Sequence, residues 1–332
     1  MNGSASTGEA GEAPALRMTG GPLHVVTGAL GYTGRALAEQ LLARGCRVRT
    51  LTNSPNRPNA FGPALEIAPL AFNDPGALAR SLEGAAVLHN TYWVRFNKPG
   101  YFTFDEAVRN TKALFAAAKA AGVPRIVHVS ILHATEADDL GYYRGKHELE
   151  DALKSLGTPH SIVRPGVLFG RFDILVNNIT WALRHLPIFG VFGSGEYRLR
   201  PLHVDDMASL MVRESARAEN ATVDAVGPEG FTYRELATTL ARIVNVRRRI
   251  VSVPPALGWV VAQMVNPFVK DTIITKQEIQ GLMRGLLDST AAAAGPTKLT
   301  EWAAQHADEL GVRYASEVGR RLQRSAAYID VK

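Results

Sequence analysis

Three glycines after an apolar run near the N-terminus constrain the fold more than any other feature of this sequence. Leu23–Thr27 has the composition of a buried strand; Gly28, Gly31 and Gly34 follow it directly, where a helical pattern over Thr33–Arg44 begins. In a strand–turn–helix unit, the first glycine permits a tight turn, the second lets the backbone approach a pyrophosphate, and the third allows close helix packing. The helix N-terminus adds N–H groups and a positive dipole end. The sequence therefore predicts a turn that binds the phosphates of a dinucleotide.

Strand-like and helix-like segments alternate from Leu23 to about Val226, which is the pattern of βαβ units in a parallel sheet. The predicted strands are Leu23–Thr27, Arg47–Leu51, Leu65–Leu70, Ala86–His89, Arg125–Ser130, Ser161–Arg164 and Thr222–Val226. The clearest helices are Thr33–Arg44, Asp105–Ala121 and Tyr142–Leu156, the last two ending near Gly122 and Gly157, where left-handed C-cap residues belong. We expect an α/β fold: a Rossmann-like, doubly wound parallel sheet with a smaller, mostly helical C-terminal lobe.

The strand signal fades after Gly227, and helical patterns dominate the rest of the chain. The predicted helices there are Thr232–Val244, Pro255–Val265, Thr275–Leu286, Leu299–Leu310 and Tyr314–Gln323. The 332 residues exceed the usual size of one compact core. We therefore predict a disordered tail over residues 1–20 and a Rossmann domain over residues 21–227, which includes a substrate-lobe segment at about 170–200. A helical substrate lobe follows over residues 228–332, with the active-site cleft between the two.

Composition and charge exclude several classes of protein. The net charge is +6, but no basic stripe is interleaved with aromatic residues, so we expect no nucleic-acid partner. The single cysteine, Cys46, argues against disulfides and a cysteine-based metal cluster, so we expect no metal and a cytoplasmic location. Residues 1–20 lack the apolar core of a signal peptide. The apolar stretch Val251–Val265 is shorter than the roughly 20 residues of a membrane span, so we predict a buried or surface-lying helix there and no membrane span.

The end of the second predicted strand bears on which dinucleotide is bound. An acidic residue about 20 positions after the glycine turn accepts the ribose hydroxyls of NAD. Here the strand runs into Thr52-Asn53-Ser54, and the next carboxylate is Glu66. Arg35 and Arg57 could pair with a 2′-phosphate. NADP is favoured, and NAD is the alternative.

Three further motifs carry a family resemblance: Tyr142-Tyr143-Arg144-Gly145-Lys146, Arg164-Pro165-Gly166 and His203-Val204-Asp205-Asp206. With the glycine turn, they make the chain resemble the short-chain dehydrogenase/reductase superfamily over roughly residues 22–245. It looks most like the atypical extended branch, which includes bacterial NAD-dependent epimerase/dehydratase-type proteins and the NADPH-binding accessory subunit of respiratory complex I. We read Asp205-Asp206 as the N-cap of a helix.

The resemblance implies that a Tyr-x-x-x-Lys pair does the chemistry. Residues four apart share a helix face, so Lys146 would hold the nicotinamide ribose while its charge lowers the pKa of Tyr142. The superfamily hydroxyl that binds a substrate carbonyl would fall near Leu132, which cannot donate a hydrogen bond. Ser130 or His133 could substitute for it.

The leading hypothesis is an NAD(P)-dependent oxidoreductase that transfers hydride at a carbonyl or alcohol carbon of a small-molecule substrate, with Tyr142 as acid or base. The alternatives are a non-catalytic NADPH-binding structural or redox-sensing protein and a nucleotide-sugar epimerase or dehydratase. A peripheral membrane or quinone-related role through Val251–Val265 is a third idea, and a homodimer stays open. The predicted catalytic residues are Tyr142, Lys146 and Ser130. The predicted cofactor-binding residues are Gly28, Leu30, Gly31, Tyr32, Thr33, Gly34, Arg35, Asn53, Arg57, Thr91, Lys146, Pro165 and Gly166.

Overall fold

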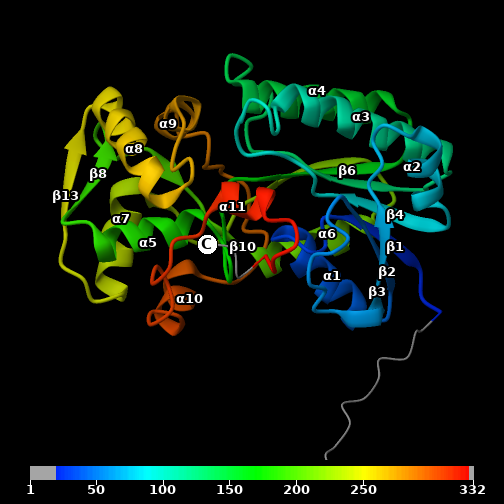
Figure 1. The fold of residues 1–332 in the computed structure, drawn as a ribbon, viewed down its shortest axis with the longest axis horizontal. Helices are drawn as coiled ribbons and strands as arrows, with labels where there is room; N and C mark the ends of the chain where they lie inside the picture. The colour runs from blue at the N-terminus through cyan, green and yellow to red at the C-terminus, as the bar shows by residue number, and fades with distance from the viewer. Residues whose placement is uncertain (1–19, 329–332) are drawn as a thin grey trace, which may run out of the picture.

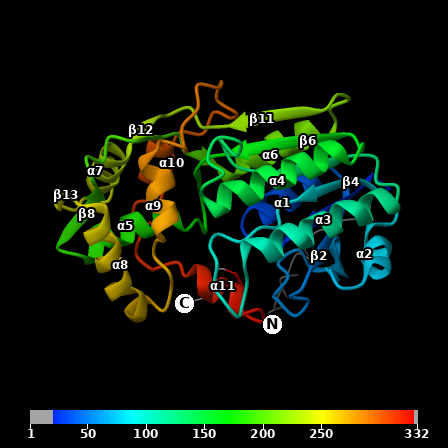
Figure 2. The ribbon, with the colours of Figure 1, turned by 90° about the horizontal axis from the view of Figure 1, so that it is seen from above.

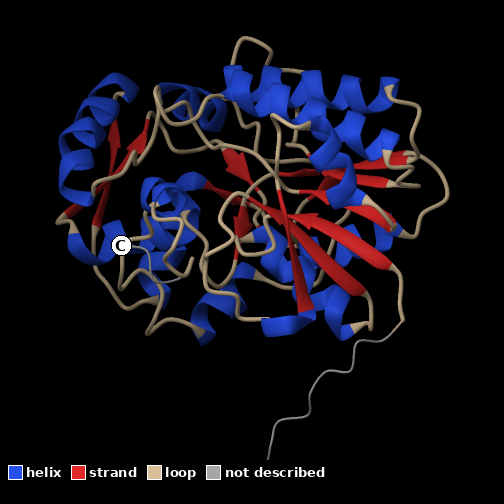
Figure 3. Ribbon diagram, turned by 45° about the vertical axis from the view of Figure 1, so that its right-hand side comes forward, coloured by secondary structure: helices blue, strands red, loops and turns tan. Residues whose placement is uncertain are grey.

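The computed structural model describes residues 20–328, so the predicted tail lies outside the described residues except for Gly20. Seven parallel strands form one sheet in the order β11-β6-β5-β4-β1-β2-β3 (Figures 1 and 3). They are β1 (Leu23–Thr27), β2 (Arg47–Thr52), β3 (Leu65–Pro69), β4 (Ala85–Asn90), β5 (Ile126–Val129), β6 (His160–Pro165) and β11 (Ala221–Ala225). Each predicted strand is present to within one residue at both ends. The Rossmann-like doubly wound sheet is confirmed.

The sheet is buried because helices cover both of its faces (Figure 2). Helices α1 (Thr33–Ala43) and α6 (Val204–Ser215) pack together on one face. Helices α2 (Pro75–Leu82), α3 (Phe104–Ala120) and α4 (Gly141–Ser155) cover the other. Strand β1 lies between β2 and β4, so the order of strands reverses there. Open α/β sheets bind ligands at the carboxyl ends of the strands beside such a reversal.

Local details of the helix ends confirm one expectation and correct another. Gly122 and Gly157 have φ angles of 68° and 78°, as expected of residues that follow helix C-termini. The N-cap of α6 is His203, whose ring accepts a hydrogen bond from the N–H of Asp205. The N-cap prediction for Asp205-Asp206 is therefore wrong, because the helix begins one residue earlier than the acidic pair.

A second group of elements packs around its own apolar core beside the sheet (Figure 1). Its helices are α5 (Leu175–His185), α7 (Tyr233–Ile243), α8 (Pro255–Val269), α9 (Lys276–Met283) and α10 (Leu299–Gln305). Its strand pairs are β7 (Leu168–Phe169) with β10 (Leu202–His203), β9 (Arg198–Leu199) with β12 (Phe231–Thr232), and β8 (Ile188–Phe192) with β13 (Arg249–Val253). Helix α11 (Glu317–Leu322) follows these elements in the chain and contributes no side chain to this core. A 3-10 turn, η1 (Gly62–Ala64), precedes β3.

Several elements after Gly227 differ from the sequence expectations; α10, for example, ends at Gln305 and not at the predicted Leu310. Strand β13 lies after Gly227, where no strand was expected. Its five residues pair with a single strand 61 positions earlier, so the local sequence carries little signal for it. Helix α11 begins later than the predicted Tyr314–Gln323, because the Ser316 side chain caps it by accepting from the N–H of Gly319. No helix within residues 20–328 has the length and apolarity to cross a membrane.

Candidate functional site

The glycine turn after β1 has the geometry of a phosphate-binding turn. Gly28 has a φ of 72°, a conformation that glycine adopts without strain. The N–H of Gly31 donates to the carbonyl oxygen of Gly28 at 2.8 Å. A Cβ at Gly34 would lie 2.4 Å from that same oxygen, so only glycine lets α1 begin so close to the turn. The first and third glycines thus have the mechanical roles that the spacing predicts.

The residues around this turn fit the diphosphate of a dinucleotide. Helix α1 begins at Thr33, no side chain caps it at Tyr32, and its first turn holds no acidic residue. The N–H groups of that turn therefore keep their capacity to bind an anion. Leu30 is buried beneath the turn, and Thr91 lies beside it, donating its hydroxyl to the Thr27 carbonyl at 2.6 Å.

The two arginines proposed for a 2′-phosphate lie in different surroundings. The Arg35 guanidinium pairs with Glu39 at 3.0 Å and lies 5.6 Å from the centre of the Phe172 ring. Arg57 is 8 % exposed and donates to the backbone carbonyl of Arg320 at 2.7 Å. Asn53, between them in the chain, is exposed. Arg35 is therefore partly exposed beside the turn and pairs with an exposed glutamate, whereas Arg57 is buried and bonded to the C-terminal segment.

The end of the C-terminal segment (residues 316–328) lies against the glycine turn. A ring carbon of Tyr328 is 4.0 Å from the position that a Cβ on Gly31 would take. The guanidinium groups of Arg57 and Arg320 lie 5.7 and 4.3 Å from the centre of this ring. No motif in the sequence indicates this contact, because it joins residues almost three hundred positions apart.

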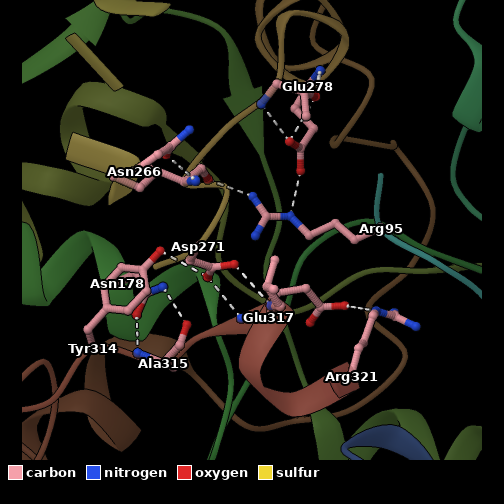
Figure 4. Close-up of polar contacts among 12 residues, drawn as sticks. Arg95, Asn178, Asn266, Asp271, Glu278, Tyr314, Ala315, Glu317 and Arg321 are labelled. Atoms are coloured by element: carbon pink, nitrogen blue, oxygen red, sulfur yellow. Dashed lines mark hydrogen bonds and ion pairs between the residues drawn. The ribbon is translucent and has the colours of Figure 1, made fainter. Parts of the chain in front are cut away.

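Polar contacts hold the C-terminal segment in place (Figure 4). The Asp271 carboxylate accepts from the N–H groups of Glu317 and Val318 at 2.9 and 3.0 Å, and so caps α11. Arg321 pairs with Glu317 and donates to the Trp93 carbonyl at 3.1 Å, which links α11 to the loop after β4. From the same loop, Arg95 pairs with Glu278 of α9 at 2.6 Å.

Several buried polar atoms in or beside this segment have no hydrogen-bond partner among the described residues. They include the Tyr32 hydroxyl, one carboxylate oxygen of Asp173 and the Nε atoms of Arg57 and Arg320. Burial raises the pKa of Asp173 to about 7, although backbone hydrogen bonds oppose the shift. Burial also raises the pKa of Tyr32, and nearby Asp173 adds to it. The cofactor turn therefore lies beside groups that are costly to keep desolvated.

The proposed catalytic pair meets at one aromatic ring. Tyr142 and Lys146 lie one turn apart on α4. Lys146 is 2 % exposed, donates to the Val129 carbonyl at 2.7 Å and places its Nζ 4.4 Å from the centre of the Trp93 ring. Tyr142 meets the same indole edge-on at 5.7 Å between centroids. A Cβ at position 145 would lie 2.8 Å from the Trp93 ring, so the absence of a side chain at Gly145 leaves room for the indole.

The electrostatics of the pair differ from the sequence expectation. Burial lowers the pKa of Lys146 to about 7, against the opposing effect of Glu150. Burial raises the pKa of Tyr142, and Tyr143 adds to the increase. The lowering of the Tyr142 pKa by Lys146 is not found in this structure, because desolvation dominates at both side chains.

Ser130 lies in a buried ionic network. Its hydroxyl donates to Glu150 at 2.6 Å, and Arg164 pairs with the same carboxylate. Burial alone would raise the pKa of Glu150, but the hydrogen bonds from Arg164 and Ser130 bring it below its ordinary value. The Ser130 hydroxyl is committed to this carboxylate, and Ser130 is not in the wall of the cavity described next.

An apolar cavity of about 860 Å³ extends from the carboxyl edge of the sheet into the second group of elements. At the sheet edge its wall contains Tyr142, Tyr143 and Gly166. Pro165, just before Gly166, accepts from the Leu132 N–H through its carbonyl. Further out, the wall is formed by α5, β8, β13, α8 and α9. A cavity of this size and lining suits a largely apolar molecule.

A family model described as NAD(P)H-binding matches residues 28–171. The chain is 25% identical to a mitochondrial protein of Arabidopsis thaliana, NADH dehydrogenase [ubiquinone] 1 alpha subcomplex subunit 9, over 82% of this chain and 72% of that protein. It is 27% identical to the ceramide reductase of Caulobacter vibrioides, over 69% of this chain and 73% of that protein. These matches make the N-terminal part an NAD(P)H-binding domain.

Among solved structures, the chain is similar to an NADPH-dependent quinone oxidoreductase of Escherichia coli complexed with NADPH. The TM-score is 0.71 and the identity 20%, with 86% of this chain and 99% of that chain covered. At this identity the likeness shows a shared fold.

Proposed function

Because the chain belongs to the atypical short-chain dehydrogenase/reductase superfamily, we propose that it is an NADPH-dependent oxidoreductase acting at a carbonyl or alcohol carbon. The observation that carries this proposal is Tyr142, which lies in the wall of an apolar cavity one helical turn from Lys146. Bound NADPH would supply hydride to the substrate carbon. The missing carboxylate at Thr52-Asn53-Ser54 supports NADPH over NADH.

Tyr142 supplies the proton in this proposal. Its raised pKa keeps the phenol protonated at neutral pH, which suits a donor to the oxygen of a carbonyl under reduction. Trp93 and Phe104 pack edge-on against the ring and fix its direction. No group within residues 20–328 hydrogen-bonds to its hydroxyl, so the proton is available to a substrate.

Lys146 binds the nicotinamide ribose in this proposal. An ammonium has three N–H donors, and the Val129 carbonyl accepts from only one of them. Trp93 covers the Nζ of Lys146, so the indole must move aside before ribose hydroxyls can reach the ammonium group. Lys146 therefore acts in binding, and its loss would lower affinity as well as turnover.

The non-catalytic alternative draws support from two observations. Leu132 is fully buried at the position where the superfamily resemblance expects a hydroxyl, and Ser130 is bonded to Glu150. The nucleotide-sugar alternative is less well supported, because an apolar cavity offers little to a sugar diphosphate.

The experiment that tests the proposal compares two neighbouring tyrosines of the same cavity wall. Tyr142→Phe should lower the rate of NADPH oxidation roughly 10²–10⁴-fold while NADPH affinity stays within about twofold. Tyr143→Phe is the matched control and should stay near wild-type activity. The assay screens apolar aldehydes, ketones and quinones. Full activity in Tyr142→Phe, or an inert wild type that still binds NADPH, would favour the non-catalytic alternative.

A further inference from the structure

Helix α8 exposes an apolar stripe that no described residue covers. Its fifteen residues include no charged side chain. Val260, Met264 and Phe268 recur every fourth position and are 45, 67 and 87 % exposed. Residues four apart share one helix face. A contiguous exposed apolar surface of this kind marks contact with another molecule or with lipid.

An adjoining stripe of the same helix lines the apolar cavity. Leu257, Val261 and Val265 are in the cavity wall, and the first two are also 53 and 50 % exposed. Ile188 of β8 likewise lies in the cavity wall and is also 49 % exposed to solvent. The wall of the cavity therefore continues onto the outer surface, so α8 forms part of the cavity mouth.

Within residues 244–270, which include α8, every charged side chain is basic, and the next residue, Asp271, is buried. Residues 244–270 contain Arg247, Arg248, Arg249 and Lys270 but no aspartate or glutamate. Arg247, Arg249 and Lys270 are exposed. Next to the helix, the Nζ of Lys276 lies 4.2 Å from the centre of the Trp259 ring. Apolar side chains flanked by cations, with an indole among them, are typical of helices that lie in a membrane interface.

We infer that α8 docks this protein on an anionic lipid bilayer, and that an apolar substrate enters the cavity from the lipid beside α8. Figure 1 shows α8 and β13 at one end of the molecule, remote from β3 at the other end of the sheet. The charge pattern favours lipid headgroups over a second copy of this chain, because two copies would bring the same cations together. The entry of substrate rests on the proposed oxidoreductase function, whereas the docking does not.

Co-sedimentation of the full chain with vesicles tests the docking. We expect the protein to sediment with vesicles of phosphatidylcholine and phosphatidylglycerol, and about tenfold less with phosphatidylcholine alone. Met264→Glu/Phe268→Glu should weaken binding roughly a hundredfold, because both side chains leave the lipid. Ile67→Glu is the matched control: Ile67 is 39 % exposed on β3 and should leave binding unchanged. Thermal unfolding near that of the wild type shows that the variants fold.

Three outcomes would overturn the inference. The wild type could stay in the supernatant with both kinds of vesicle, or the double variant could sediment like the wild type. A dimer in lipid-free solution that the double variant splits, without vesicle binding, would assign the stripe to a second copy. Tyr142→Phe should sediment like the wild type, so failure of the catalytic proposal cannot be mistaken for failure of docking.

Discussion

The cofactor turn and the apolar cavity both lie at the carboxyl edge of the sheet, yet they are constructed in opposite ways. The turn is made by the backbone, and the Tyr328 ring of the distant C-terminal segment lies beside it, with Arg57 and Arg320 against that ring. The cavity is made of apolar side chains and opens onto α8, which exposes more of the same kind. A site built from the backbone needs glycines and is visible in the sequence, whereas one built from side chains of many elements is not.

The largest effect is expected at the turn itself. Gly31→Asp should weaken NADPH binding by about 10²–10⁴-fold, because it sets a carboxylate against the phosphates at the start of α1. Isothermal titration calorimetry measures the NADPH affinity, and Gly76→Asp on α2 is the matched control. If the two regions are independent, Met264→Glu/Phe268→Glu leaves NADPH affinity unchanged. Near-wild-type affinity in a folded Gly31→Asp would remove the phosphate-site assignment.

Buried titratable groups should give the cofactor region a distinct pH dependence. Asp173 has its pKa raised from 3.8 to about 7, so between these values the folded protein holds a proton that the unfolded chain releases. The free energy of unfolding contributed by this group therefore falls as the pH rises through that window, on the order of a few kcal/mol. Urea denaturation should show the slope in the wild type and a flatter one in Asp173→Asn. Parallel slopes for these two proteins would contradict the assignment, while the α8 double variant should keep the wild-type slope.

Discrimination between the two dinucleotides should depend on Arg35. The wild type is expected to bind NADPH more tightly than NADH, and Arg35→Ala should reduce that ratio roughly tenfold or more by removing a charge-assisted hydrogen bond. Arg44→Ala, at the other end of α1, is the control. The measurement is the dissociation constant of each cofactor for the wild type and for both variants. Tighter binding of NADH than of NADPH by the wild type would refute the preference.

The smallest effect concerns the C-terminal segment. The Tyr328 ring lies over Gly31, where the phosphates need space, so Tyr328→Ala should increase NADPH affinity by about 5–30-fold as two arginine–ring contacts are lost. Tyr328→Phe keeps the ring and should bind like the wild type. Weaker binding by Tyr328→Ala would mean that the segment is part of the cofactor site and does not obstruct it.

The sequence by itself determined the sheet, its strand ends and the turn. Each of these depends on local patterns: apolar runs of strand length, helical periodicity, and glycines at positions where a Cβ meets the backbone, as at Gly34. The cofactor class followed from the same turn. The positions of Tyr142 and Lys146 on one helix face also followed, because four-residue spacing fixes them.

Only the tertiary structure decided the surroundings of these residues. It joined Trp93 to Lys146, Glu150 to Ser130, and Tyr328 to the glycine turn, and it raised the pKa of Tyr142 where a lowering was expected. It also left one stripe of α8 exposed, although apolar composition is equally typical of a buried helix. Burial and desolvation depend on which distant segments pack together, and no local pattern encodes that choice.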